Sequence, residues 1–198
     1  MTKIILASAS KRRSGILNSC GIRHKVVVTN AEEIVDQKYS VRQMVAINAA
    51  AKADLAAIRA KDGIIIAADT LVAHGKEIMG KPKDESDAKR MLAQFSGNRI
   101  EVYTGLCVYD IKTKKRAQAV DKSEIIVANI SKKDIGKYFH HLGPYDKAGG
   151  FSVEGVGSMI FDNIHGSYFN ILGLPMMKLR ELFEEIGLDL ADFVCKKA

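Results

Sequence analysis

The stretch Gly63-Ile64-Ile65-Ile66-Ala67-Ala68-Asp69-Thr70 decides the fold class of this chain. Its middle is a short, continuous apolar run, and two polar residues follow it. Such a run is typical of a central strand that is buried on both faces, because helices cover both sides of the sheet. The stretch therefore predicts an α/β fold. It also predicts that Asp69-Thr70 lies at the carboxyl end of that strand, where ligands of open α/β sheets bind.

The segments on either side of this stretch alternate between strand and helix patterns. Before it, the sequence predicts a strand at residues 4–7, a helix that follows the loop at residues 8–13 and ends at Gly21, a strand at 23–29, and an Ala-rich helix from Ser40 to about Ala60. After it, the sequence predicts a hairpin at 71–79 turning at His74-Gly75, a helix at 84–95, strands at 99–109 and 117–130, a helix from Ser131 to Tyr138, a strand at 158–164, and a last helix opened by Pro175. We expect one elongated unit over residues 1–198, with a mixed, twisted β-sheet flanked by helices and a central cleft.

Composition and charge exclude several classes of protein. The 198 residues include 30 Lys plus Arg against 23 Asp plus Glu, a formal charge of +7, and 47 % are hydrophobic. That apolar content argues against disorder, no apolar run approaches the roughly 20 residues of a membrane helix, and the apolar start is too short for a signal peptide. The three scattered cysteines argue against a disulfide framework or a zinc site, so we expect a cytoplasmic protein that binds no membrane.

The basic runs could point to nucleic acid, but no aromatic residues interleave them. We therefore favour small anionic substrates over nucleic acid as the partners of this chain, because they account for the same excess of cations.

Two of the polar clusters follow predicted strands. In Ser8-Ala9-Ser10-Lys11-Arg12-Arg13, hydroxyls and cations lie between a strand and a helix start, which is how α/β proteins hold phosphate. The ordinary alternative is a capped helix with solvated arginines. Asp69-Thr70 could hold Mg²⁺ or orient a water molecule, whereas the ordinary alternative is a turn aspartate.

Two further clusters are weaker when taken alone. Lys81 in Gly80-Lys81-Pro82 and Lys52 on the Ala-rich helix could be phosphate-binding cations, but local evidence alone favours a surface turn and a solvated lysine. The glycine-rich stretch from Tyr145 to Gly157, which includes Glu154, could contact a ligand closely or could be a long loop without a ligand.

Taken in order, these pieces resemble the Maf family of nucleoside triphosphate pyrophosphatases, and the resemblance extends from residue 3 to about 187. The matching stretches are Leu6 to Arg13, Lys52-Ala53, Ala67 to Thr70, Gly80-Lys81-Pro82, Ser96-Gly97 with Val102 to Gly105, Asp146 to Gly150, and Gly166-Ser167-Tyr168 with Gly173-Leu174-Pro175. This chain departs from the family pattern at Lys11, where Pro is usual, at Ile100, where His is frequent, and at Glu154, where Gln is most common.

The resemblance implies an activity and roles for particular residues. A nucleoside triphosphate would be hydrolysed between its α- and β-phosphates with the help of a divalent metal, Mg²⁺ or else Mn²⁺ or Co²⁺. Asp69 would be a metal ligand or the general base, and Glu32 and Glu33 would help to hold the metal. The remaining residues implied by the resemblance are the phosphate-binding cations Arg13, Lys52 and Lys81 and the hydrogen-bonding hydroxyls Ser8 and Ser10. A homodimer is also expected.

Base preference in the family varies with three positions, which here are Arg12, Thr70 and Glu154. The first two resemble the form that acts on dTTP and UTP, whereas Glu154 resembles the form that acts on 7-methyl-GTP. We predict dTTP and UTP as substrates. The alternatives are 7-methyl-GTP or a broader range of nucleotides, an inosine or xanthosine triphosphate pyrophosphatase, and a regulator of cell division that binds nucleotide or nucleic acid without catalysis.

Overall fold

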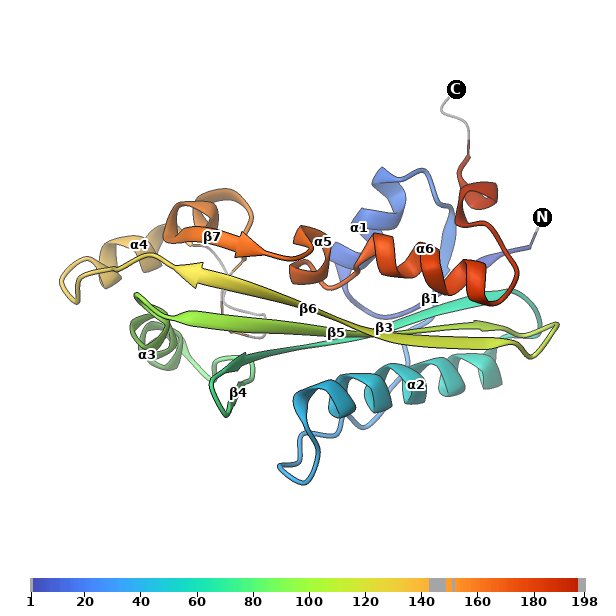
Figure 1. Cartoon of the computed structure of the whole chain (residues 1–198), viewed down its shortest axis with the longest axis horizontal. Helices are drawn as coiled ribbons and strands as arrows, with labels where there is room; N and C mark the ends of the chain where they lie inside the picture. The colour runs from blue at the N-terminus through green and yellow to red at the C-terminus, as the bar shows by residue number, and fades with distance from the viewer. Residues whose placement is uncertain (1, 143–148, 151, 196–198) are drawn as a thin grey trace. The chain divides into compact units, whose positions relative to one another are not determined.

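The computed structural model describes residues 2–142, 149–150 and 152–195 (Figure 1). Its strands form one sheet in the order β2-β1-β3-β5-β6-β7, with β4 paired to β3. β1 pairs in parallel with β2 and β3, whereas β4 pairs antiparallel with β3 and β7 pairs antiparallel with β6. The predicted fold class is therefore confirmed: α/β, with a mixed sheet flanked by helices.

The strands are β1 (Ile4–Ala7), β2 (His24–Val26), β3 (Ile64–His74), β4 (Glu77–Met79), β5 (Arg99–Asp110), β6 (Arg116–Val127) and β7 (Phe161–His165). The α-helices are α1 (Lys11–Ser19), α2 (Val41–Arg59), α3 (Glu85–Phe95), α4 (Ile135–His141), α5 (Tyr168–Ile171) and α6 (Met176–Glu185). Two 3₁₀ helices complete the described elements: η1 (Gly155–Ile160) and η2 (Leu190–Phe193).

The chain divides into two compact units, each built from segments that are distant in sequence. The first unit comprises Met1–Asp69, Thr104–Asp121 and Gly173–Ala198, and the second comprises Thr70–Tyr103 and Lys122–Leu172. Strands β3, β5 and β6 each contribute residues to both units. The single domain, its elongated form and its central cleft stay predictions.

In the first unit, α2 packs on one face of the sheet, and α1 and α6 lie on the other (Figure 1). Successive residues of a strand face opposite sides, so alternate residues of β1 and β3 pack against α2. The buried side chains of this cluster are Ile5, Ala7, Ala49, Ala53, Ala56, Ile65, Ala67, Cys107 and Ile111. The alanines bring α2 close to the sheet, and at Gly105 an added Cβ would lie 2.2 Å from the backbone oxygen of Val45.

In the second unit, a separate apolar cluster joins α3 to α4 and η1. Its buried members are Leu92, Ile130 and Ile160. A buried polar network fixes the connection from β7 to α5: Ser123 Oγ donates to Ser167 O at 3.0 Å and accepts from Asn170 Nδ2 at 2.9 Å. The same Nδ2 donates to Val102 O at 3.0 Å, so α5 has a defined position relative to β5 and β6.

Local sequence accounts for most helix ends. Ser40 caps α2 in a capping box: its side chain accepts from the Gln43 backbone, and the Gln43 side chain accepts from the Ser40 backbone. Asp84 caps α3, which begins at Glu85, and Pro175 precedes α6, the helix that it was predicted to open. Within the described ranges, no helix is both long enough and apolar enough to cross a membrane.

Several predicted boundaries were wrong because hydrogen bonds, rather than composition, set them. β2 ends at Val26 rather than Thr29, since its partner β1 is itself only four residues long. The β3–β4 turn is one residue later than predicted, because His74 still pairs with Glu77. Ser131 does not cap α4: its hydroxyl donates to the Asp134 carboxylate, and the helix begins only at Ile135. Ser158 belongs to η1, where its hydroxyl donates to Gly155 O, so β7 begins at Phe161.

Candidate active site

Arg13 links three parts of the first unit. It lies in the first turn of α1, whose N-cap residue is Ser10. Arg13 Nη1 donates to Ser8 Oγ and to Ala68 O, both at 2.9 Å, and Nε donates to Gly173 O at 2.7 Å. The helix thus begins at Lys11, inside the stretch predicted as a loop. The buried Arg13 guanidinium connects the residue that follows β1, the backbone of β3 and the segment before α6.

The charge on Arg13 is balanced by nearby carboxylates. The pKa of Arg13 is lowered to about 10, mainly by burial and to a smaller extent by the neighbouring Arg12, while Asp69 and Glu33 oppose the shift. With a pKa of about 10 the guanidinium stays protonated at neutral pH. The first turn of α1 therefore carries a positive charge that is already paired with protein oxygens.

Asp69 is the best-defined carboxylate of the first unit. It is 4 % exposed and lies on β3. Its Oδ1 accepts from Lys52 Nζ at 2.6 Å, and its Oδ2 accepts from Asn48 Nδ2 at 3.0 Å. The same ammonium lies 2.7 Å from Glu33 Oε1, so Lys52 joins the two carboxylates. The prediction that Asp69 lies at the end of its strand was wrong, because β3 continues to His74 through buried apolar residues.

Asn48 is the residue of this cluster that the sequence analysis missed. It lies four residues before Lys52 on α2, and helical geometry places the two side chains on one face. Its Oδ1 accepts from Ile34 N at 2.8 Å, and its Nδ2 donates to Ile34 O at 3.2 Å as well as to Asp69. The available signal was a polar residue one turn before Lys52 on a face of the helix that is otherwise rich in alanine.

The structure brings together one part of the predicted site. Ser8, Ser10, Arg13, Glu33, Lys52 and Asp69 belong to the first unit and are joined by the contacts described above. Arg12 is half-buried in the same unit, and Glu32 is exposed beside Glu33. Thr70 follows Asp69 in sequence but belongs to the second unit, together with the exposed Lys81 and Glu154. The predicted contacts of residues 143–148 lie outside the described residues.

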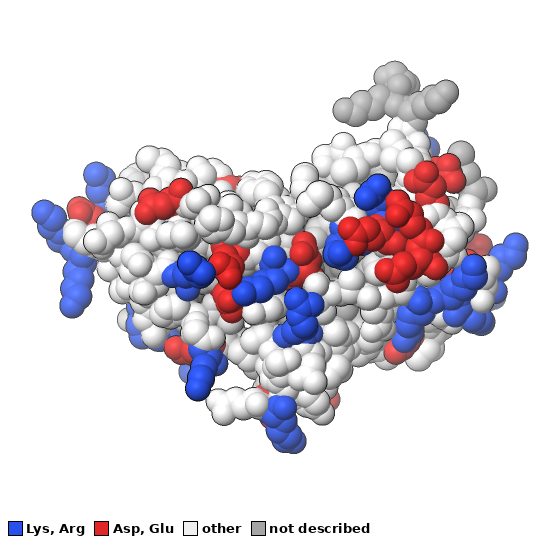
Figure 2. Space-filling model, in the orientation of Figure 1, with Lys and Arg blue, Asp and Glu red and all other residues white. Residues whose placement is uncertain are grey.

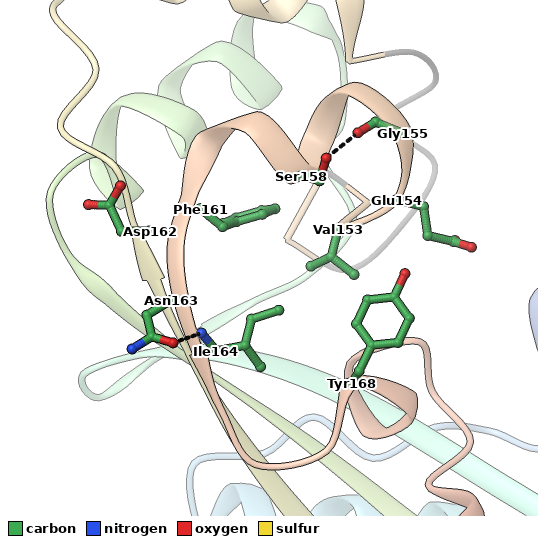
Figure 3. Close-up of a pocket in the computed structure, with 9 residues that line it drawn as sticks. All are labelled: Val153, Glu154, Gly155, Ser158, Phe161, Asp162, Asn163, Ile164 and Tyr168. Atoms are coloured by element: carbon green, nitrogen blue, oxygen red, sulfur yellow. Dashed lines mark hydrogen bonds between the residues drawn. The ribbon is translucent and has the colours of Figure 1, made fainter.

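The second unit contains a pocket of about 520 Å³ at one side of β7 and η1 (Figure 3). Its lining residues are Val153, Glu154, Gly155, Ser158, Phe161, Asp162, Asn163, Ile164 and Tyr168. In Figure 3 the Tyr168 ring extends from α5 toward Val153 and Glu154, whereas the side chains of Asp162 and Asn163 point away.

Glu154 is held at the edge of this pocket. Ser152 Oγ donates to Glu154 Oε2 at 3.2 Å. Burial, and then the negative charge of Glu154, raise the pKa of Tyr168, so its phenol stays protonated at neutral pH. The pocket therefore places the Tyr168 phenol, an O–H donor, near the Glu154 carboxylate, which only accepts hydrogen bonds.

The donor chemistry around Lys52 suits a hard divalent cation. Glu33 and Asp69 present carboxylate oxygens to one shared positive group. Among the residues that the structure describes, no group of three or more His, Cys, Asp or Glu side chains is arranged to hold a metal ion. Mg²⁺ sites in phosphate-handling proteins commonly use only one or two carboxylates, with water and phosphate oxygens as the other ligands. The carboxylate pair therefore fits such a cation.

Figure 2 shows one face of the molecule, on which Lys and Arg are interspersed with Asp and Glu. Several charged side chains of the second unit are paired: Lys122 Nζ lies 2.5 Å from Glu101 and 3.0 Å from Glu124, and Arg99 lies 3.0 Å from Glu124. Part of the chain's positive charge is thus offset by local ion pairs.

The fold places this chain among α/β proteins of a known architecture. Its structure is similar to that of the Staphylococcus aureus Ham1 protein, with a TM-score of 0.52 at 14 % sequence identity, over 93 % of this chain and 99 % of that one. At that identity the similarity concerns the fold alone.

Sequence comparison identifies the family. The family described as Maf-like protein matches residues 3–186, and the chain belongs to it. A protein named dTTP/UTP pyrophosphatase from Desulforamulus reducens is 36 % identical over 190 residues, which cover 96 % of this chain and 100 % of the relative. Proteins of the same name are 35 % identical in Caldicellulosiruptor saccharolyticus and 34 % identical in Bacillus cereus, each covering 96 % of this chain and 98 % of the relative.

Proposed function

We propose that this Maf-family chain hydrolyses nucleoside triphosphates to the monophosphate and pyrophosphate, with dTTP and UTP as its preferred substrates. The observation that carries the proposal is the full-length similarity to relatives named dTTP/UTP pyrophosphatase. The buried Asp69–Lys52 ion pair, which the exposed Glu33 also contacts, is a second observation that supports it. A buried ion pair contributes little net stability compared with apolar packing, so stability alone does not explain this pair.

In this reaction, water adds across the phosphoanhydride bond between the α- and β-phosphates. We assign Asp69 as the group that orients the water and accepts its proton, because it is fixed at both carboxylate oxygens and can act as a general base. Lys52, Arg13 and Lys81 are the cations assigned to the phosphates, whose negative charge increases in the transition state. Ser8 and Ser10 are assigned as hydrogen-bonding partners of the phosphate oxygens.

A divalent metal is the cofactor we assign, held by Asp69 with Glu33 and Glu32. Mg²⁺, Mn²⁺ and Co²⁺ all accept oxygen ligands of this kind. When bound, such an ion neutralises phosphate charge and polarises the phosphoryl oxygens. The chain's own contribution is to hold the two carboxylates close to one point, as their common contact with Lys52 demonstrates.

Base preference is the part of the proposal that Glu154 complicates. Arg12 and Thr70 match the form that acts on dTTP and UTP, but the Glu154 carboxylate only accepts hydrogen bonds and so suits the N1–H and N2–H₂ donors of guanine. One observation favours 7-methyl-GTP as a second candidate: the Tyr168 ring beside Glu154 offers an aromatic face to a cationic base. We keep dTTP and UTP as the proposed substrates because the full-length relatives carry that name.

A triphosphate panel tests the function directly. The purified chain is incubated with dTTP, UTP, 7-methyl-GTP, GTP, ITP and XTP, with and without Mg²⁺, Mn²⁺ or Co²⁺, and released pyrophosphate is measured. We expect metal-dependent release that is fastest with dTTP and UTP. A preference for ITP or XTP would indicate the rival pyrophosphatase class, and binding without any product would favour a nucleotide-binding regulator. The cytoplasmic location, the homodimer and the minor role of nucleic acid stay predictions from the sequence.

A further inference from the structure

We propose that Asn48 is a positioning residue. It holds two groups in place around the Lys52 ammonium: the segment that carries Glu33, and the carboxylate of Asp69. The inference rests on the proposed function only where it connects this arrangement to catalysis. The arrangement itself is defined by hydrogen bonds within the first unit.

Asparagine at position 48 destabilises the folded chain unless its buried amide group is well hydrogen-bonded. It is 1 % exposed and lies inside a helix rich in alanine, where asparagine has a lower helix propensity than its neighbours. A buried amide also loses its water, and only well-placed partners offset that loss. Here Oδ1 accepts one hydrogen bond and Nδ2 donates two, so the side-chain nitrogen uses both of its hydrogens.

Two of these hydrogen bonds bind the backbone of Ile34, the residue after Glu33. Ile34 N–H donates to Asn48 Oδ1 at 2.8 Å, and Ile34 O accepts from Asn48 Nδ2 at 3.2 Å. Residues 28–35 form neither helix nor strand, so their backbone groups lack the regular partners that a helix or a sheet provides. Asn48 therefore fixes both backbone polar groups of Ile34, the residue that follows Glu33.

The third hydrogen bond reaches Asp69. Asn48 and Lys52 lie one helical turn apart on α2, and they bind Oδ2 and Oδ1 of the same carboxylate at 3.0 and 2.6 Å. Contacts at both oxygens fix the plane of the carboxylate. Because Lys52 also contacts Glu33 at 2.7 Å, the contacts form a closed ring through Asn48, Ile34, Glu33, Lys52 and Asp69. Removing Asn48 opens this ring at two places.

The test compares Asn48→Leu, which keeps a similar volume but has no hydrogen-bonding group, with Arg59→Ala as a matched control. Arg59 Nη1 donates to Val28 O at 2.5 Å, so this control releases the same segment at another point without touching Asp69. The readouts are hydrogen exchange of the Ile34 amide, melting temperature, and kcat and KM for dTTP with Mg²⁺.

We expect Asn48→Leu to accelerate Ile34 exchange by at least about tenfold, since the amide loses its acceptor. We expect kcat to fall by about tenfold to a hundredfold, because small displacements of reacting groups have effects of that size. KM should stay within about threefold, because the phosphate-binding cations are unchanged. Arg59→Ala should keep the slow Ile34 exchange, and its kcat should stay within about twofold of wild type.

A second variant keeps the test decisive if Asn48→Leu does not fold. Asn48→Asp retains an acceptor for Ile34 N–H but has no amide hydrogen for Asp69, so Ile34 should stay protected while kcat falls. Unchanged Ile34 exchange in Asn48→Leu, or unchanged kcat in both Asn48 variants, would overturn the proposal. So would an equal loss of kcat in Arg59→Ala, because general loosening would then explain the effect. A wild-type chain that releases no pyrophosphate refutes the proposed function instead, and the Ile34 exchange comparison then decides the structural part alone.

Discussion

At the residue scale, the Asp69 carboxylate is the group on which the proposed chemistry depends most. Asp69→Asn keeps the size of the side chain but removes its charge and its basicity. We expect the rate of pyrophosphate release to fall by at least about a hundredfold, the usual size of a lost general-base contribution. Lys52 keeps its contact with Glu33, so the variant should still fold, and its melting temperature should be recorded alongside. Asp62→Asn, an exposed aspartate in the same unit, is the control that should keep near-normal activity. Near-normal activity of Asp69→Asn would remove Asp69 from the mechanism.

Glu154 tests base choice at the same scale. Glu154→Gln replaces an acceptor-only carboxylate with an amide that also donates, which suits the N3–H and carbonyl edge of a pyrimidine. We expect kcat/KM for dTTP and UTP to rise about tenfold relative to guanine nucleotides, equivalent to ~1.4 kcal/mol in transition-state binding. Asp162→Asn changes charge by the same amount in the same pocket, but its side chain points away (Figure 3), so the ratio should not move. If the wild type already prefers 7-methyl-GTP by more than about tenfold, the substrate assignment is wrong.

At the scale of elements, the position of α2 depends on how closely β5 approaches it. Gly105→Ala places a Cβ 2.2 Å from Val45 O, a backbone atom that moves only with its helix. We expect the free energy of unfolding to fall by about 1–3 kcal/mol, as for other overpacked cores, and activity to fall with it because Asn48 and Lys52 move with α2. Gly15→Ala is the matched control: nothing lies within 4 Å of its added Cβ inside α1, so this change should stabilise the chain by about 0.5–1 kcal/mol. Denaturant unfolding of both variants measures the difference, and equal stabilities would contradict this account of the packing.

The elements themselves could largely be predicted, whereas their ends and contacts could not. The apolar run at residues 64–68 and the Ser40 cap are local signals, and both β3 and α2 form where these signals are. The end of β2 and the start of α4 depend on partners that local composition does not specify.

The same limit applies to the candidate site. Ser8, Arg13, Lys52 and Asp69 belong to recognisable motifs, and the structure joins them within the first unit. Asn48 belongs to no motif, because its importance arises from the Ile34 backbone, which is brought to it by a segment without regular structure. Helical spacing could relate Asn48 to Lys52, but only the fold relates it to Asp69.

At the scale of the whole molecule, the two compact units share three continuous strands. The boundary between the units crosses β3 between Asp69 and Thr70, and it also crosses β5 and β6. If one unit unfolded alone, each of these strands would have to become disordered in one half while its other half stayed in the sheet. That would remove interstrand hydrogen bonds on both sides of the boundary. We therefore expect residues 1–198 to unfold as a single cooperative domain.

The absence of tryptophan from the sequence makes this prediction easy to test. Tyr109→Trp introduces one fluorophore into the first unit, and Tyr138→Trp introduces one into the second, both at half-buried positions. In separate variants, the two fluorescence transitions and the far-UV circular dichroism of each should coincide in urea, and the calorimetric and van't Hoff enthalpies should agree. Each variant must first match the wild-type denaturation midpoint by circular dichroism, so that the substitution itself is not the cause of any difference. Two separated fluorescence midpoints would contradict this prediction. They would show that a shared strand can lose its pairing in one unit while keeping it in the other, and that the units are independent domains.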